Sequence, residues 1–135
     1  MADLFPGLTL GEALDESQSF VLPFKLGGTV AKGDVVKFST HTTGELPTVV
    51  QATQYATNVL GVALKAGVSG DIIPVLIFGV VKVTASGAIT GGVLVVAGAT
   101  GYVETIGTQT HEKVIGKALQ TFGDGDTGLV QILLR

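Results

Sequence analysis

The sequence contains neither cysteine nor tryptophan, and only 14% of its 135 residues are charged. The lack of cysteine excludes a disulfide framework and thiolate metal sites, and it leaves the cellular compartment open. The eight Lys and Arg residues are scattered singly in a chain of net charge −3. Such a chain has no basic patch that could follow a phosphate backbone, so we expect no direct binding to nucleic acid.

Targeting and membrane-spanning signals are also missing. The first residues lack a basic segment followed by a long apolar run, so a secretory signal is not expected. The stretch 83–103 has no charge, but glycines and threonines interrupt it at turn spacing. This pattern favours two short strands with their loops over a spanning helix, and no membrane association is expected.

Residues of the types used in catalysis are few and lack the spacing of a known catalytic motif. His41 lies near Ser39 and Glu45, and His111 adjoins Glu112. No serine lies in a G-x-S-x-G turn, so a small hydrolytic or ligand-binding barrel is only a minor alternative. Two histidines without an acidic cluster also make a poor transition-metal site.

Two glycine-rich patterns could suggest ligand loops. The segment 122–128, FGDGDTG, resembles a calcium loop but lacks the third oxygen ligand and the distant bidentate Glu, so a turn is favoured. Neither G-x-G-x-x-G before a helix nor a P-loop motif occurs, which gives no support to nucleotide binding. We therefore expect no enzymatic activity, no metal and no cofactor.

What the sequence does contain is apolar residues, at 46%, and 20 glycines. This composition is typical either of a β protein with many tight turns or of a protein whose apolar surface is covered by partners. We favour the second interpretation, because exposed apolar patches usually mark interaction sites.

The chain also repeats itself. The segment 59–77 recurs without gaps at 114–132, and an upstream block, 28–36, recurs at 87–95. We infer two related halves, 27–79 and 86–134, within one β domain at 27–135. Residues that match within the repeat are interpreted as fold-defining, at bends or turns: Gly61, Gly70, Asp71, Gly116, Gly125 and Asp126.

Short strands separated by glycine turns predict an all-β fold, a small barrel with little helix. The expected strands cover 19–24, 34–39, 47–52, 59–64, 71–78, 80–84, 92–97, 102–106, 114–120 and 127–134. A hairpin is expected around 98–101, and a short helical piece could lie at 48–55 or 109–113.

Residues 1–26 form an N-terminal arm with a lead-in strand in this interpretation. Apolar side chains alternate there with turn formers, and an acidic cluster follows at 12–16. The arm either docks on a partner or folds as a strand or cap onto its own domain. The docking residues that we predict are Leu4, Phe5, Pro6, Leu8 and Leu10.

Several motifs together resemble the capsid cement, or decoration, proteins of tailed phages and related viruses. They are G-x-V-x-x-G-D-V-V-K at 28–37, V-L-G-V-A-L-K-A-G at 59–67, G-D-I-I-P-V at 70–75, G-A-I-T-G-G at 87–92, V-I-G-K-A-L at 114–119 and the G-D-x-G-L-V-Q-I-L-L ending. The resemblance covers about 28–134 and leaves the arm unmatched.

The resemblance implies a fold similar to the β-tadpole decoration proteins of lambdoid phages. It also implies a virion protein, made in the host cytoplasm, that binds the outside of the head where capsomers meet and stabilises the mature shell. The implied partners are the major capsid protein and further copies of the chain, as a homotrimer. The alternative is another virion module, such as the base of a head fibre or a tail-associated protein.

Overall fold

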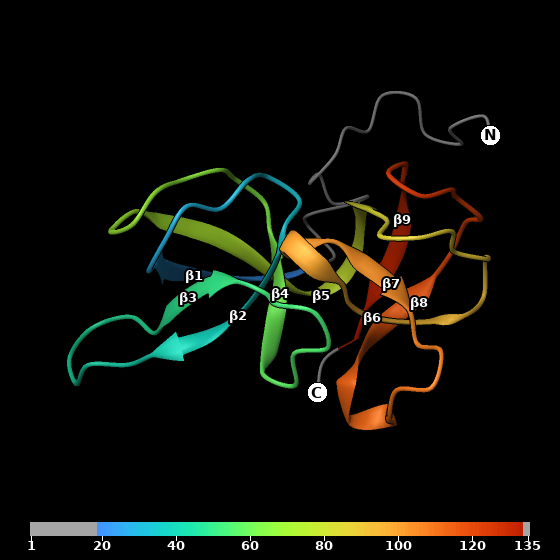
Figure 1. Cartoon of the computed structure of the whole chain (residues 1–135). Helices are drawn as coiled ribbons and strands as arrows, with labels where there is room; N and C mark the ends of the chain where they lie inside the picture. Colours follow the sequence, from blue (N-terminus) through green and yellow to red (C-terminus); the bar gives the residue numbers. More distant parts are fainter. Residues whose placement is uncertain (1–18, 134–135) are drawn as a thin grey trace.

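The computed structural model describes residues 19–133, and these residues form nine β-strands and two short 3-10 helices (Figure 1). The elements are β1 (Phe20–Leu26), β2 (Val35–Thr40), β3 (Thr48–Gln51), β4 (Val59–Ala63), β5 (Ile72–Thr84), β6 (Leu94–Ala97), η2 (Ala99–Gly101), β7 (Val103–Thr105), η3 (His111–Lys113), β8 (Val114–Ala118) and β9 (Thr127–Ile132). The expected all-β class is confirmed. The short helical piece lies at η3, whereas the alternative at 48–55 is wrong because β3 pairs there as a strand.

The first five strands close into a small barrel, which we call the first barrel. Hydrogen-bonded neighbours follow the order β1-β3-β2-β4-β5, and β1 pairs again with β5 to complete the circle. Closure satisfies the backbone groups that an open sheet would leave at its edges. The predicted small barrel is therefore confirmed.

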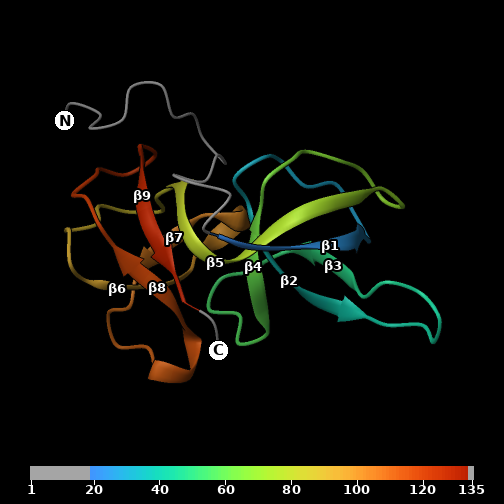
Figure 2. The same ribbon diagram turned by 180° about the vertical axis from the view of Figure 1, so that it is seen from behind.

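A second unit of the same design follows, which we call the second barrel. Its strands lie in the order β5-β9-β8-β6-β7. The chain just after β5 makes a parallel bridge from Ala85 to Val103 of β7, where the first barrel has the parallel pair Leu26–Val49. Figures 1 and 2 show the two barrels side by side, with η2 between them in the first view.

Strand β5 belongs to both barrels. Its residues before Gly79 pair with β1 and β4, and its residues from Gly79 onward pair with β9. The prediction of two strands, 71–78 and 80–84, is therefore wrong in this respect. Gly79 has a φ of +143°, a conformation that other residues rarely adopt, and it lets one 13-residue strand pass between the barrels without ending.

The two barrels share their register of pairing. Gly61 lies opposite Val36 in the first, and Gly116 lies opposite Val95 in the second. The correspondence also extends upstream of residue 27, because the cross-strand pair Pro23–Pro74 in β1 and β5 matches Lys82–Leu129 in β5 and β9. The second half of β5 thus repeats β1.

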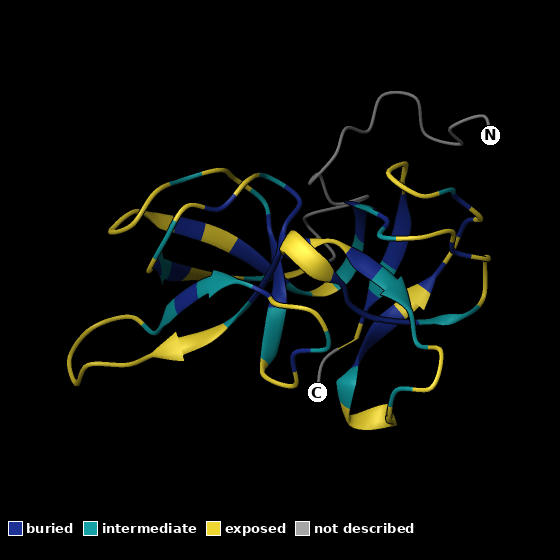
Figure 3. Ribbon diagram, viewed as in Figure 1, coloured by how far each residue is buried: buried dark blue, intermediate teal, exposed yellow. Residues whose placement is uncertain are grey.

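The core has two parts, and one of them joins the barrels. Eight buried residues, among them Leu26, Ile73 and Val75, fill the first barrel. The larger cluster fills the second barrel and also includes Val35 and Leu76, although strand alternation points these two away from the interior of the first. The second barrel therefore covers one face of the first, and Figure 3 shows buried strands concentrated towards the centre of the molecule.

Candidate functional site

The predicted docking residues of the arm, Leu4, Phe5, Pro6, Leu8 and Leu10, lie outside the residues that the structure describes. The described chain begins at Ser19, which lies against Gly79 in the middle of β5. The described chain therefore begins where the two barrels meet.

One surface of the first barrel is unusually apolar for an outer face. Strands β1 and β5 run antiparallel with Phe20 opposite Phe78, and the exposed fractions of these side chains are 51% and 41%. Farther along the pair, Pro23 lies opposite Pro74, and both are exposed. Ile72, at 61%, is the most exposed large apolar residue in the described chain. We call these five residues the apolar ribbon; β1 lies on the near side of the first barrel in Figure 2.

The ribbon is a candidate binding surface because its five apolar side chains are exposed; Lys25, opposite Ile72, is its charged neighbour. Proline has no backbone N–H, so the Pro23–Pro74 pair cannot donate hydrogen bonds to an added strand. A partner would therefore bind here through apolar contact, and burying such side chains contributes about 25 cal/mol per Å² of apolar surface.

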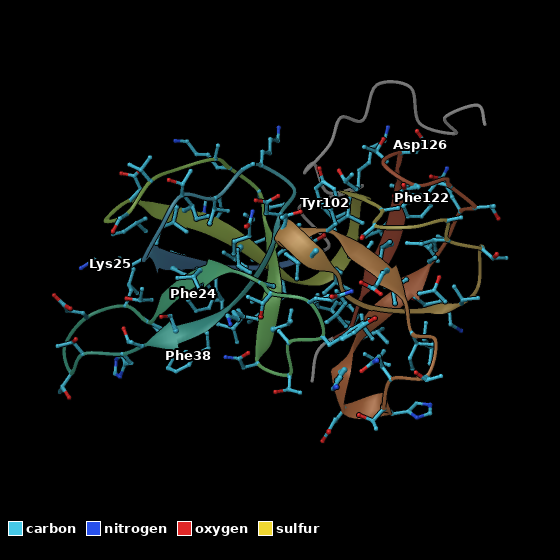
Figure 4. All side chains as sticks on the ribbon, in the orientation of Figure 1. Phe24, Lys25, Phe38, Tyr102, Phe122 and Asp126 are labelled. Atoms are coloured by element: carbon cyan, nitrogen blue, oxygen red, sulfur yellow. The ribbon has the colours of Figure 1, made fainter. Side chains whose placement is uncertain are left out.

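Polar contacts fix the two barrels to one another. The Tyr55 amide donates to the carbonyl oxygen of Ala97 at 2.9 Å, and the Gln54 Nε2 donates to the Glu104 Oε1 at 2.9 Å. A side-chain hydrogen bond with Glu104, reinforced by the charge of that carboxylate and by slight burial, raises the pKa of Tyr55 above 10.0. Figure 4 shows Tyr102, which follows η2, in this central region.

A cavity of about 170 Å³ lies between the barrels, and Val59, Gly61, Ile77, Ile115 and Ile132 contribute to its lining. Pockets for small organic ligands usually measure about 300–1,000 Å³. The cavity is thus below the size of an ordinary ligand site, and we assign it to imperfect packing at the junction.

Two of the repeated glycines, Gly61 and Gly116, lie where the backbone of a neighbouring strand comes very close. A β-carbon on Gly61 would overlap the carbonyl oxygen of Leu76, and one on Gly116 would overlap that of Gln131. Gly70 and Gly125 have φ angles of +94° and +76° in equivalent turns.

The aspartates that follow these turn glycines sit on tight turns. The Asp71 Oδ2 accepts a hydrogen bond from the Val68 amide at 2.9 Å, and the Asp126 amide donates to the Gly123 carbonyl oxygen at 3.0 Å. Sequence reasoning missed Asp34, which accepts from the Ala31 amide and from the Gln51 Nε2. The available signal was its Gly-Asp dipeptide, the same as at 70–71.

The residues considered for catalysis lie apart. His41 is in the exposed loop between β2 and β3, and its Nε2 is 3.1 Å from the carbonyl oxygen of Glu45. His111 begins η3 on the second barrel. Within residues 19–133, no group of three His, Cys, Asp or Glu side chains could hold a metal ion. In the same part of the chain, no helix has both the length and the apolar character needed to cross a bilayer.

Comparison with known proteins identifies the family. The family model described as phage cement protein matches residues 15–134. Among solved structures, the crystal structure of the head fiber gp8.5 N base in bacteriophage phi29 is similar, with a TM-score of 0.68 and 18% identity over 86% of this chain and 95% of that one. At that identity the likeness concerns the fold alone. No curated protein matches the sequence. Because the family model spans most of the chain, including both barrels, this protein belongs to the phage cement protein family and is a component of the virion capsid.

Proposed function

We propose that this protein binds the outer surface of the phage head where capsomers meet and stabilises the mature shell. The observation that carries the proposal is the family match over 15–134. A protein that binds the assembled lattice but not its separated subunits opposes disassembly by mass action. No catalytic step is needed for this role.

The major capsid protein is the proposed partner, and the apolar ribbon is the part of the body proposed to contact it. The ribbon lies within the matched residues, whereas Leu4–Leu10 precede them. The arm is proposed to add a second contact, with its apolar side chains in pockets of the neighbouring surface and its main chain paired to a sheet edge. Two linked contacts raise affinity through effective concentration.

Self-association as a homotrimer is part of the same proposal. Three chains would place three ribbons and three arms at one junction, and the avidity of such an assembly exceeds that of each contact. Light scattering of the purified full-length chain tests this: a trimer mass supports the proposal, and a monomer mass at every concentration contradicts self-association before binding.

Binding to heads tests the contacts. Purified heads that lack the protein are incubated with the full chain, with a variant lacking residues 1–17, with Ile72→Lys and with Thr108→Lys, and bound protein is measured after sedimentation. Ile72 belongs to the ribbon, and Thr108 is an exposed loop residue of the second barrel that serves as the matched control. We expect full binding for the wild type and Thr108→Lys, and at least about a tenfold loss for Ile72→Lys, as for the truncated chain. Undiminished binding by the truncated chain would contradict the role of the arm, and undiminished binding by Ile72→Lys would contradict that of the ribbon.

The alternative role, as the base of a head fibre, has only the fold likeness to the phi29 protein behind it. The two roles differ in where the protein sits. Cement proteins at capsomer junctions would cover the lattice, and a fibre base would carry a further chain that projects from the head.

A further inference from the structure

One end of the first barrel leaves inward-pointing side chains open to solvent. Leu22 of β1 has the same strand alternation as Phe24 and Leu26, which are buried in the core of this barrel. Phe38 of β2 has the same alternation as the buried Val36. Both residues therefore point inward, yet the exposed fraction is 39% for Leu22 and 38% for Phe38.

Two further residues complete this layer of the barrel. Leu60 of β4 and Ile77 of β5 are half-buried and pack against the core of the first barrel. Because the strands of a small barrel are tilted to its axis, residues from different strands meet in layers. Four of the five strands contribute to this layer, which we call the mouth, with the residues Leu22, Phe38, Leu60 and Ile77. Figure 4 shows Phe38 of the mouth on the first barrel.

The second barrel has the same layer in a covered state. The exposed fractions there are 0%, 0%, 6% and 3% for the equivalent residues Val81, Ala97, Ile115 and Ile132. The first barrel supplies the cover, because its outer-face residues Val35, Val62 and Leu76 belong to the same cluster. The loop after β3 adds the hydrogen bond from the Tyr55 amide to the carbonyl oxygen of Ala97. Within residues 19–133, the mouth of the first barrel has no comparable cover.

A second copy of the chain cannot repeat this cover in a head-to-tail arrangement. The covering residues of the first barrel are neighbours on adjacent strands. At the equivalent, identically paired positions the second barrel has Leu94, Lys117 and Gln131. Lys117 is exposed, and placing its ammonium group on an apolar mouth would cost its hydration. We therefore expect a different protein to cover the mouth.

The mouth is continuous with the apolar ribbon. Leu22 lies between Phe20 and Pro23 in β1, and Ile77 precedes Phe78 in β5. A partner that covers the ribbon therefore also reaches the mouth. The four mouth residues are all apolar, so they favour an apolar group and disfavour a charged one, which would lose its hydration without gaining a partner.

We propose that a large aliphatic or aromatic side chain of the major capsid protein inserts into the mouth. The inference rests on the proposed function and adds the chemistry of the partner, which is an apolar projection beside the area that covers the ribbon. A few anchors of this kind carry most of the binding energy of an interface. The inserted group gives the first barrel the covered layer that the second barrel already has.

Thiol protection on heads tests the proposal, and the natural lack of cysteine allows single labels. Leu22→Cys is compared in the full chain with Leu119→Cys, since Leu119 is an exposed leucine of the second barrel, just after β8. The rate of reaction with a maleimide is measured for the free protein and for the protein bound to purified heads. We expect both thiols to react in the free protein. On heads, the Leu22→Cys rate should fall about tenfold, because an occupied site buries most of the contacted surface, and the Leu119→Cys rate should change less than about twofold.

A charge in the mouth provides the second test. Phe38→Asp should weaken head binding about tenfold or more, whereas Phe38→Leu and the control Leu119→Asp should bind within about twofold of the wild type. Circular dichroism checks that each variant is folded.

The outcomes separate this inference from the proposed function. A wild type that does not bind heads would contradict the proposed function, and this inference with it. Heads that bind normally while the Leu22→Cys thiol stays reactive, or that bind folded Phe38→Asp like the wild type, would overturn the inference alone. A Leu22→Cys thiol that is already unreactive in the free protein would show that the chain itself or a second copy covers the mouth, which would also overturn it.

Discussion

The ring of Phe122 occupies the space that a side chain on Gly128 would need. At the equivalent positions of the first barrel the sizes are reversed, with Gly67 in place of the phenylalanine and the buried Ile73 in place of the glycine. Leu26 packs against Gly67 there, and its equivalent in the second barrel is the smaller Ala85. The two barrels thus reach a filled core by exchanging large and small residues at matching sites, as interiors of uniform density require.

This exchange predicts strong coupling between Phe122 and Gly128. Phe122→Ala should lower the free energy of unfolding by about 3–5 kcal/mol, because it leaves a cavity in the second barrel. Gly128→Ala should destabilise the wild type by crowding the ring but cost much less in a Phe122→Leu background. Urea unfolding of the wild type, Gly128→Ala, Phe122→Leu and the double variant gives the coupling energy between the two positions. Phe38→Ala removes a partly exposed phenylalanine and serves as the control. Additive effects would show that the ring does not fill the space at Gly128.

The close approach of strands at Gly61 and Gly116 predicts that neither position accepts a side chain. Gly61→Ala and Gly116→Ala should each cost about 3 kcal/mol or more, because the added carbon meets a backbone oxygen that cannot move without breaking the ladder. Gly28→Ala is the matched control, since nothing lies within 4 Å of its added carbon. Melting temperatures of the three variants decide the matter. If Gly61→Ala has the same melting temperature as Gly28→Ala, the crowding inferred between Gly61 and the backbone of β5 is wrong.

Asp34 is predicted to stabilise the first barrel more than an ordinary surface aspartate. Its Oδ2 accepts from the Ala31 amide at 3.0 Å and from the Gln51 Nε2 at 2.8 Å, and only 7% of the residue is exposed. Asp34→Ala leaves both donors without this acceptor and should cost about 2–3 kcal/mol. Asp124→Ala, which removes one exposed bond to the Gly87 amide, should cost about 1 kcal/mol or less by the same measurement. Equal losses would mean that burial adds nothing to the Asp34 bonds.

The contact between Tyr55 and Glu104 predicts a phenol that ionises late. The hydrogen bond with Glu104 and its negative charge raise the pKa of Tyr55 above the ordinary 10.0. Because the folded-state pKa lies above the unfolded one, the stabilisation is complete below pH 10 and is lost as the pH rises through the folded pKa. Absorbance at alkaline pH in a Tyr102→Phe background isolates the group. Glu104→Gln should lower this pKa, while Glu112→Gln should leave it unchanged; the reverse result would exclude Glu104 as the cause.

The sequence allows the barrel fold to be predicted because its repeat is visible in residues that the backbone constrains. Gly61 and Gly116 recur since each lies under a carbonyl oxygen, and no other residue fits there. The exchange of sizes at Phe122 and Gly128 cannot be found in this way, because the two halves carry different residues at the matching positions and a repeat search detects only similar residues. Asp34 escapes for a similar reason, since Val93 stands at the matching position.

The arrangement of the barrels could not be predicted from the pattern of apolar residues. Gly79 has the sequence signature of a break, yet its positive φ lets β5 continue into the second barrel. Val35 and Leu76 lie in strands whose apolar residues alternate as in any half-buried strand. The alternation is the same whether such a residue packs inside its own barrel or against a neighbouring barrel. The same ambiguity hides which exposed apolar residues meet a partner, so the ribbon became apparent only when the register placed Phe20 beside Phe78 and Pro23 beside Pro74.

The most direct test of the cement role is electron cryomicroscopy of heads that lack the protein, imaged with and without the purified full-length chain. If the protein is a cement protein, added density is expected on the outer surface at the junctions between capsomers across the whole lattice, with two small barrels per chain and the β1–β5 face of the first barrel against the shell. Density confined to a single vertex or to the tail, or heads that remain bare at saturating protein, would contradict it.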